Sequence, residues 1–85
     1  MYSAYVLRSQ KKDIFYIGHT QNIEKRLLEH NSRGNKKWAG RYQPWILVYI
    51  ENFETRGQAM EREQYLKSLK RGNKWKELEQ KFLLG

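Results

Sequence analysis

The chain has 85 residues and a formal net charge of +8 at pH 7, with 17 Lys and Arg against nine Asp and Glu. It contains no cysteine, which excludes disulfide bonds and any zinc site built on thiolates. A chain of this length is expected to form one domain, residues 1–85, with a modest core. The charge favours a nucleic-acid partner over a membrane surface, because no predicted helix combines a broad apolar face with a purely basic one.

The start of the sequence shows no targeting or membrane segment. The apolar run that begins at Tyr2 is broken by Arg8 and Gln10, well short of a secretory or membrane-spanning length. A small chain without disulfides also suits a reducing compartment. We therefore expect a cytoplasmic protein with no membrane partner.

Two short segments predict a hairpin. Residues 2–8 and 14–18 carry aromatic and β-branched side chains with a period of two, and the polar turn of residues 9–13 joins them. We expect the two strands to pair antiparallel. An even number of loop residues would place Tyr5 and Tyr16 on the same face of the sheet, whereas a three-residue loop would separate them.

A helix is predicted over about residues 23–31, after Gly18 ends the second strand. Thr20 and Asn22 are both good N-caps for it. His19 falls just beyond the predicted strand end, in the kind of position where catalytic groups are often displayed.

The following segment, residues 32–43, is basic, contains two glycines and is predicted to be irregular. It combines cations with one aromatic ring, a composition suited to binding phosphates and stacking one base. The predicted nucleic-acid-binding residues are Arg33, Lys36, Lys37, Trp38 and Arg41.

The second half of the chain contains one strand and two helices. Residues 45–52 form an apolar run that predicts a strand buried on both faces. Residues 55–58 have the spacing of a capping box, so a helix should run from there to about Lys70, and a last helix is expected over residues 74–83. The order β-β-α-β-α-α predicts an α+β domain, a three-stranded antiparallel sheet flanked by helices.

Glu63 is the carboxylate most suited to chemistry, because its helical position directs it towards the core. Burying an unpaired carboxylate costs several kcal/mol, so it needs a cation. One interpretation is a salt bridge to Arg62, Arg26 or Lys67. The other is a divalent metal, since Mg²⁺ often uses only one or two protein ligands.

Four more side chains have both a catalytic and a structural interpretation. Arg26 could bind a phosphate through two parallel hydrogen bonds, or pair with Glu29 or His30 as a solvated helix residue. His30, one turn later, could donate to a phosphate or relay a proton, or could be structural. Tyr5 and Tyr16 could handle the nucleophile if a nearby cation lowers their pKa, or could simply pack a core.

These residues resemble a known family. The segments Ser3-Ala4-Tyr5 and Tyr16-Ile17-Gly18 resemble the two name-giving motifs of the GIY-YIG nuclease superfamily. Residues 20–31 are similar to its first helix, which carries an arginine, here Arg26. Residues 59–64 resemble the helix that bears its metal-binding glutamate. The resemblance extends from Tyr2 to about residue 76.

The likeness is greatest to short stand-alone members of that superfamily. In those members a His-Asn pair after the arginine recurs, here His30-Asn31, as does a proline–aromatic pair before the third strand, here Pro44-Trp45. Two departures stand out. Ser3 and Ala4 replace the glycine and isoleucine of the first motif, and His19 stands where several branches have lysine.

The resemblance implies a set of roles. Glu63 would bind one divalent ion, Mg²⁺ or Mn²⁺, and Arg26 would stabilise the phosphate. One of the two tyrosines would orient or deprotonate the attacking water, and the two histidines would line the site. The implied catalytic residues are Tyr5, Tyr16, Arg26, His30 and His19. We expect these side chains to converge on one concave surface, with Glu63 arriving across the same face of the sheet as Tyr16.

The expected function is that of a metal-dependent endonuclease that hydrolyses phosphodiester bonds in DNA, with structure-selective action in repair or recombination. RNA is a second candidate substrate, and a protein partner could supply specificity. The alternative is a catalytically weak or inactive nucleic-acid-binding module that retains the nuclease fold, an interpretation favoured by the altered first motif.

Overall fold

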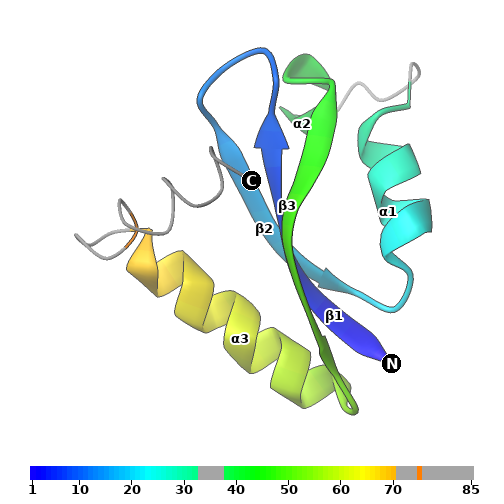
Figure 1. The fold of residues 1–85 in the computed structure, drawn as a ribbon, viewed down its shortest axis with the longest axis vertical. Coiled ribbons are helices and arrows are strands. Elements are labelled where there is room, and N and C mark those ends of the chain that lie inside the picture. The colour runs from blue at the N-terminus through cyan, green and yellow to red at the C-terminus, as the bar shows by residue number, and fades with distance from the viewer. Residues whose placement is uncertain (33–37, 71–74, 76–85) are drawn as a thin grey trace.

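The computed structural model describes residues 1–32, 38–70 and 75. The elements, in chain order, are β1 (Tyr2–Ser9), β2 (Phe15–Thr20), α1 (Ile23–His30), α2 (Trp38–Arg41), β3 (Trp45–Phe53) and α3 (Arg56–Leu69). The strands form one antiparallel sheet in the order β2-β1-β3, which confirms the predicted α+β class (Figure 1). In the described part of the chain, no helix is long and apolar enough to cross a membrane.

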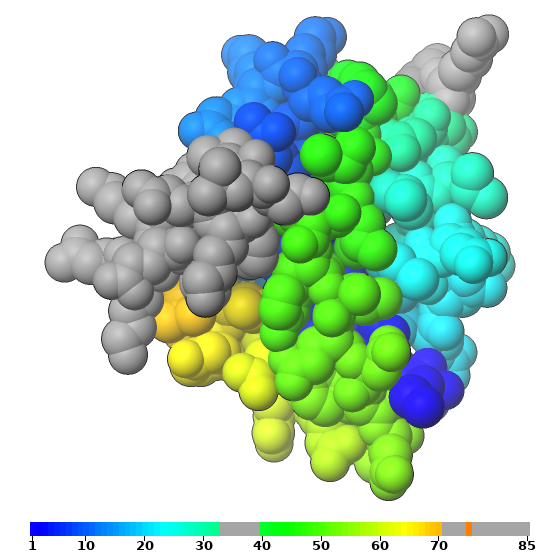
Figure 2. All heavy atoms as spheres, viewed as in Figure 1, coloured from blue at the N-terminus to red at the C-terminus, as the bar shows by residue number. Residues whose placement is uncertain are grey.

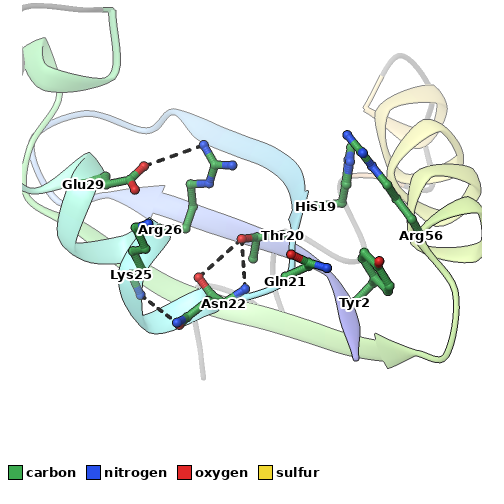
Figure 3. A pocket seen from close by; sticks show the side chains of 9 residues that line it. All are labelled: Tyr2, His19, Thr20, Gln21, Asn22, Lys25, Arg26, Glu29 and Arg56. Carbon is green, nitrogen blue, oxygen red and sulfur yellow. Dashed lines mark hydrogen bonds and ion pairs between the residues drawn. The ribbon is translucent and has the colours of Figure 1, made fainter.

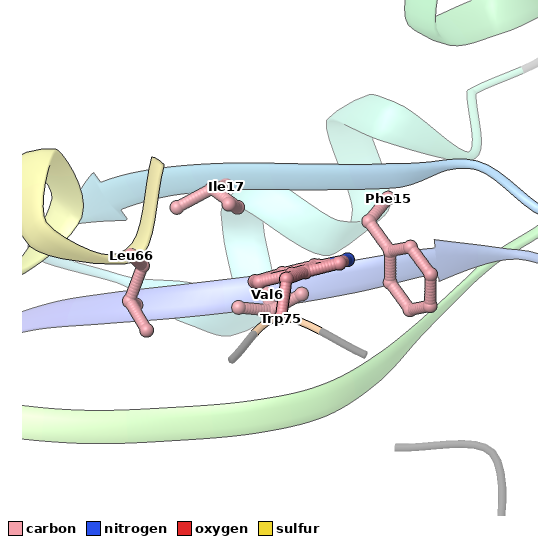
Figure 4. Close-up of a cluster of buried hydrophobic side chains, with 5 residues drawn as sticks. All are labelled: Val6, Phe15, Ile17, Leu66 and Trp75. Atoms are coloured by element: carbon pink, nitrogen blue, oxygen red, sulfur yellow. The ribbon is translucent and has the colours of Figure 1, made fainter. Parts of the chain in front are cut away.

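The sheet separates the two longer helices, which lie on opposite sides of it (Figure 1). Alternate side chains of the central strand β1 therefore enter different cores. Val6 packs with Ile17 of β2 and Leu66 of α3 on one face (Figure 4). Tyr5 packs on the other face, where Leu27 of α1 contributes to the cluster.

Strand β3 lies at one edge of the sheet, and the prediction that it is buried on both faces was wrong. Its residues are mostly half-buried or exposed, and Leu47 and Ile50 keep 37% and 38% of their surface in solvent. Figure 2 shows this part of the chain along the front of the molecule. The strand buried on both faces is β1, because it pairs on both sides. Apolar composition indicates a strand but does not give its place in the sheet.

Strand β2 ends two residues later than predicted, at Thr20, and begins one residue later, at Phe15. Gly18 does not end it, because His19 and Thr20 continue the pairing with Ala4 and Ser3 of β1. His19 is therefore a strand residue, and its direction is set by the alternation of the strand. The backbone of β1 supplies hydrogen-bond partners for these two residues, which a local turn signal cannot reveal.

The helix caps follow the local sequence. Asn22 is the N-cap of α1, where its side chain accepts a hydrogen bond from the Lys25 backbone at 3.1 Å. Thr55 and Gln58 form the predicted capping box of α3, each side chain accepting from the backbone of the other at 3.2 Å. These two caps fix where both helices leave the sheet.

The basic segment before β3 contains one helical turn, α2, which the sequence did not predict. A single turn is too short to produce a hydrophobic period, so no sequence pattern predicts this helix. Residues 33–37 of this segment lie outside the described residues. So does the helix expected over residues 74–83, apart from Trp75, whose buried ring contacts Phe15 edge-on with centroids 5.5 Å apart.

The end of α1 is tied to the start of β3 by one side chain. Asn31 accepts from the Trp45 backbone N–H at 2.6 Å through Oδ1 and donates to the Trp45 carbonyl at 3.0 Å through Nδ2. Gln43 adds a hydrogen bond to the His30 carbonyl at 2.8 Å. The His-Asn and Pro-Trp pairs noted in the sequence thus meet in space, and the contact fixes the position of His30.

We predict that Asn31→Ala lowers the free energy of unfolding by about 2 kcal/mol, because it removes both hydrogen bonds to Trp45 at about 1 kcal/mol each. Asn31→Asp keeps the acceptor but sets a carboxylate oxygen against the Trp45 carbonyl, so it should lose at least as much. Urea denaturation followed by tryptophan fluorescence measures both variants. An Asn31→Ala protein as stable as the wild type would show that the bidentate contact does not hold α1 to β3.

Candidate active site

Both tyrosines of the hairpin lie on the face of the sheet covered by α1. Tyr5 pairs with Gly18 in the register of β1 and β2, which places Tyr16, two residues earlier, on the same side. Their rings stack with centroids 6.3 Å apart and an interplanar angle of 21°. The His30 ring meets Tyr16 edge-on at 4.5 Å, so three predicted catalytic residues form one aromatic cluster.

Gly18 is required by the close approach of Tyr5. A Cβ built on Gly18 would lie 2.7 Å from the Tyr5 hydroxyl oxygen and 2.9 Å from its Cζ, both well inside van der Waals contact. The Tyr5 ring is almost completely buried and cannot move aside easily. The glycine of the second motif therefore lets the phenol lie directly against the backbone of β2.

The Tyr5 hydroxyl is protonated at neutral pH. Burial raises the pKa of Tyr5 above its ordinary value, and the neighbouring Tyr16 and Glu63 raise that pKa further, whereas Arg26 opposes them. The phenol is thus a hydrogen-bond donor and a poor base. Arg26 on α1 and Glu63 on α3 thus both influence the pKa of Tyr5, in opposite directions.

His30 is a buried, neutral imidazole. Only 7% of its surface is exposed, and burial followed by the charge of Arg26 lowers the pKa of His30, while Glu29 partly opposes this. Its Nε2 is buried and has no hydrogen-bond partner among the described residues. A neutral ring with an unused nitrogen, in contact with Tyr16, can accept a proton.

Glu63 is held by two groups. The Nδ1 atom of His19 lies 2.7 Å from Oε1, and Lys67 donates to Oε2 at 2.9 Å. Burial by itself raises the pKa of Glu63, but the hydrogen bonds from Lys67 and His19 outweigh it and lower the pKa below its usual range. The carboxylate is therefore ionised at neutral pH. Of the three salt-bridge partners considered from the sequence, Lys67 is the one observed.

The expectation that Glu63 shares a sheet face with Tyr16 was wrong. Tyr16 points towards α1, whereas Glu63 belongs to α3 on the other side, and His19 meets it there. The cause is the strand alternation, since His19 is an odd number of residues from Tyr16. Glu63 is mostly buried, although 13% of its side chain is exposed to solvent.

A pocket of about 350 Å³ wraps around the end of β2 and joins the two faces (Figure 3). Side chains of α1 form one wall, and residues from β1, β2 and the start of α3 form the other. The lining residues are Tyr2, His19, Thr20, Gln21, Asn22, Lys25, Arg26, Glu29 and Arg56. Of the predicted site residues, Arg26 and His19 line this pocket, whereas Tyr5, Tyr16, His30 and Glu63 do not. His19 connects the pocket to Glu63 through the contact of its Nδ1 atom with Oε1.

Arg26 lines the pocket and is only loosely held. Its guanidinium lies 3.8 Å from the Glu29 carboxylate, and 42% of its side chain is exposed. An exposed pair at this distance contributes little to stability. Arg26 can therefore turn from Glu29 towards an anion in the pocket.

The chain is similar in sequence to known proteins. Residues 1–77 match the model of the GIY-YIG catalytic domain. The chain belongs to the GIY-YIG family. A UPF0213 protein of Bacillus licheniformis is 43% identical over 77 residues, which cover 91% of this chain and 78% of the relative. A UPF0213 protein of Staphylococcus haemolyticus is 35% identical over 71 residues (84% and 87%), and one of Clostridium perfringens is 40% identical over 70 residues (82% and 74%).

GIY-YIG membership indicates a nuclease-type function, and nucleases of this family typically use divalent metal ions. The residues present fit such an ion. Glu63 is ionised, reachable from solvent and already holds a cation, Lys67, while His19 adds a ring nitrogen beside it. Within residues 1–32, 38–70 and 75 no group of three or more His, Cys, Asp or Glu side chains gathers, so an ion there would rely on few protein ligands.

The predicted nucleic-acid-binding loop is only partly described. Arg33, Lys36 and Lys37 lie outside the described residues, while Trp38 and Arg41 belong to α2, where Arg41 is exposed. Arg41, whose side chain is described, does not line the pocket at the end of β2.

Of the nine pocket residues, only His19 and Arg26 were predicted as site residues. The unpredicted ones include a tyrosine and two cations, Tyr2, Lys25 and Arg56. Tyr2 was read only as the first residue of a strand. Lys25 immediately precedes the arginine of α1. Arg56 did carry a signal, because it occupies the first position of α3, where the helix dipole favours an acidic residue.

We predict that Gly18→Ala in this GIY-YIG chain lowers the free energy of unfolding by about 1–3 kcal/mol, because the added methyl group collides with the buried Tyr5 ring. Combining it with Tyr5→Phe removes the closest atom and should recover part of the loss. Thermal and urea denaturation of the two single variants and the double variant form a mutant cycle. Strictly additive effects would contradict a direct contact.

The lowered pKa of His30 predicts a loss of stability in acid. The unfolded chain takes up a proton near pH 6.5, but the buried ring resists protonation until lower pH, so stability falls as pH decreases below about 6.5. We expect His30→Gln to flatten the fall between pH 7.5 and 5.5. Urea midpoints at the two pH values make the comparison, and an unchanged slope in His30→Gln would contradict the assignment.

Proposed function

We propose that this protein is a divalent-metal-dependent endonuclease that hydrolyses phosphodiester bonds in DNA. The observation that carries the proposal is the pocket at the end of β2, which Arg26 of α1 lines together with His19, whose ring contacts the ionised Glu63 of α3. Lys25 and Arg56 add two further cations to the lining. A positively charged opening next to an ionised carboxylate suits a polyanionic substrate together with a metal ion.

We assign Glu63, with His19 beside it, to hold the ion, which when bound would supply positive charge to the phosphodiester oxygens. Arg26 binds the same phosphate from the other wall and stabilises the negative charge that grows on it during attack. Tyr5, kept protonated by its surroundings, donates a hydrogen bond to the reacting group. Glu63 and Arg26 thus serve charge neutralisation, and Tyr5 serves positioning.

We assign the deprotonation of the attacking water to Tyr16 and His30 acting together. Tyr5 is unsuitable as a base, because its pKa is raised. His30 is neutral, and its ring lies against that of Tyr16. Tyr16 orients the water and His30 takes up positive charge as the proton leaves, an arrangement typical of general base catalysis.

The cellular setting is part of the same proposal. A net charge of +8 supports a nucleic-acid substrate, and the lack of cysteine supports a reducing cytoplasm. We propose action on irregular DNA during repair or recombination, with RNA as a second substrate and a protein partner as a source of specificity.

A second candidate function is nucleic-acid binding without cleavage. The observation that favours it is the pairing of Glu63, whose two carboxylate oxygens both have cationic or imidazole partners. In such a module Lys67 would permanently take the place of a metal ion. The two functions differ in whether Glu63 is needed for a chemical step.

We predict that Glu63→Gln reduces Mn²⁺-supported nicking of supercoiled plasmid at least 100-fold, because the ion's contribution to transition-state stabilisation is several kcal/mol. Glu61→Gln, which removes an exposed carboxylate from the same helix, is the matched control and should nick at the wild-type rate. Circular dichroism should show both variants folded.

Equal nicking by wild type and Glu63→Gln would contradict the catalytic assignment. The decisive substrate panel consists of duplex, nicked, flapped and branched DNA, together with RNA. Tight binding without a cut strand on any of them would support the binding-module function instead.

A further inference from the structure

Three side chains of the pocket have no part in the chemistry assigned above. Lys25 on α1 and Arg56 at the start of α3 are exposed and form no ion pair with any other described residue. Tyr2, the first residue of β1, is half-buried and lines the pocket. Figure 3 shows Lys25 on the α1 wall and Tyr2 and Arg56 on the opposite wall. The pocket therefore presents two separated cations and an aromatic ring beside the reacting residues.

Arg56 is not explained by the needs of its helix. A cation in the first turn faces the positive end of the helix dipole, which is locally unfavourable. The capping box of Thr55 and Gln58 already satisfies the backbone there, and the first turn contains no acidic residue to pair with it. A basic side chain placed against the local field and directed to a pocket is suited to binding an anion.

The size of the pocket restricts the substrate. A volume of about 350 Å³ is at the lower end of sites that enclose a small molecule, and it admits a single nucleotide but not a double helix. Cations together with an aromatic ring are the features by which proteins bind a single strand, through phosphates and base stacking. Lys25, Arg56 and Tyr2 supply these features.

We propose that the pocket binds one unpaired nucleotide next to the phosphate that is cut. Lys25 and Arg56 bind the phosphates on its two sides, and Tyr2 stacks on its base. The proposal rests on the proposed function only for the position of the cut, and it specifies the substrate as nucleic acid with an unpaired stretch, such as a single strand, flap or fork.

The first experiment measures binding alone, without divalent ions. The dissociation constant of a fluorescein-labelled twelve-residue oligothymidine is determined by anisotropy for Lys25→Gln/Arg56→Gln and for Lys11→Gln/Lys12→Gln. Both double variants lose two charges, but Lys11 and Lys12 are exposed in the β1–β2 loop, at the other end of the sheet from Tyr2. The pocket variant should bind at least tenfold more weakly than the loop variant.

The salt dependence gives an independent measure. Each phosphate contact to a single strand contributes about 0.7 to the slope of log K against log salt, so loss of two contacts should reduce the slope by about 1.4 in the pocket variant. Tyr2→Leu should weaken binding of the single strand about fivefold or more, through loss of stacking, and leave blunt duplex unaffected.

Equal weakening in the two double variants would overturn the proposal, because it would show a general charge effect. Equal effects of the pocket variant on single strand and blunt duplex would overturn the assignment to unpaired nucleotides. The outcome is separable from that of the nuclease proposal. A pocket variant that loses the strand supports this inference even if Glu63→Gln still cuts, and a pocket variant that binds normally overturns it even if Glu63→Gln is inactive.

Discussion

The close contact between the Tyr5 ring and the backbone of Gly18 is the constraint on which the rest of the site depends. It brings the phenol against β2, and Tyr16 then stacks beside it and receives the edge of His30. Asn31, next in the chain, secures this arrangement by its two hydrogen bonds to β3. The aromatic cluster is therefore positioned by backbone contacts at both ends and by packing in between.

The protonation states of the site follow from where each group lies. Tyr5 keeps its proton because it is buried near other groups that become negative, and His30 stays neutral because it is buried near Arg26. Glu63 is ionised because two hydrogen-bond donors outweigh its burial. At neutral pH these groups are thus a hydrogen-bond donor, a neutral imidazole and an anion, which are the protonation states that the proposed chemistry uses.

Local features were predictable from the sequence and long-range ones were not. The hairpin, the Asn22 cap and the Thr55 capping box depend on residues a few positions apart, and the structure confirms all three. The exposed edge of β3 and the side of the sheet on which α3 packs depend on strand order, which no short pattern encodes. The site shows the same division between local and long-range features. Its motif residues were found by resemblance, whereas the pairing of Lys67 with Glu63 and the place of Arg56 in the pocket depend on three-dimensional packing.

The pairing of Glu63 with Lys67 has a consequence for how the site would be loaded. Because the ammonium group already neutralises the carboxylate, a divalent ion would enter by exchange of one cation for another and not by filling an uncompensated charge. The fold then does not rely on the ion, and occupancy would follow the free ion concentration at each moment. Such a protein would fold without the ion, and its activity would depend on the concentration of free divalent ion around it.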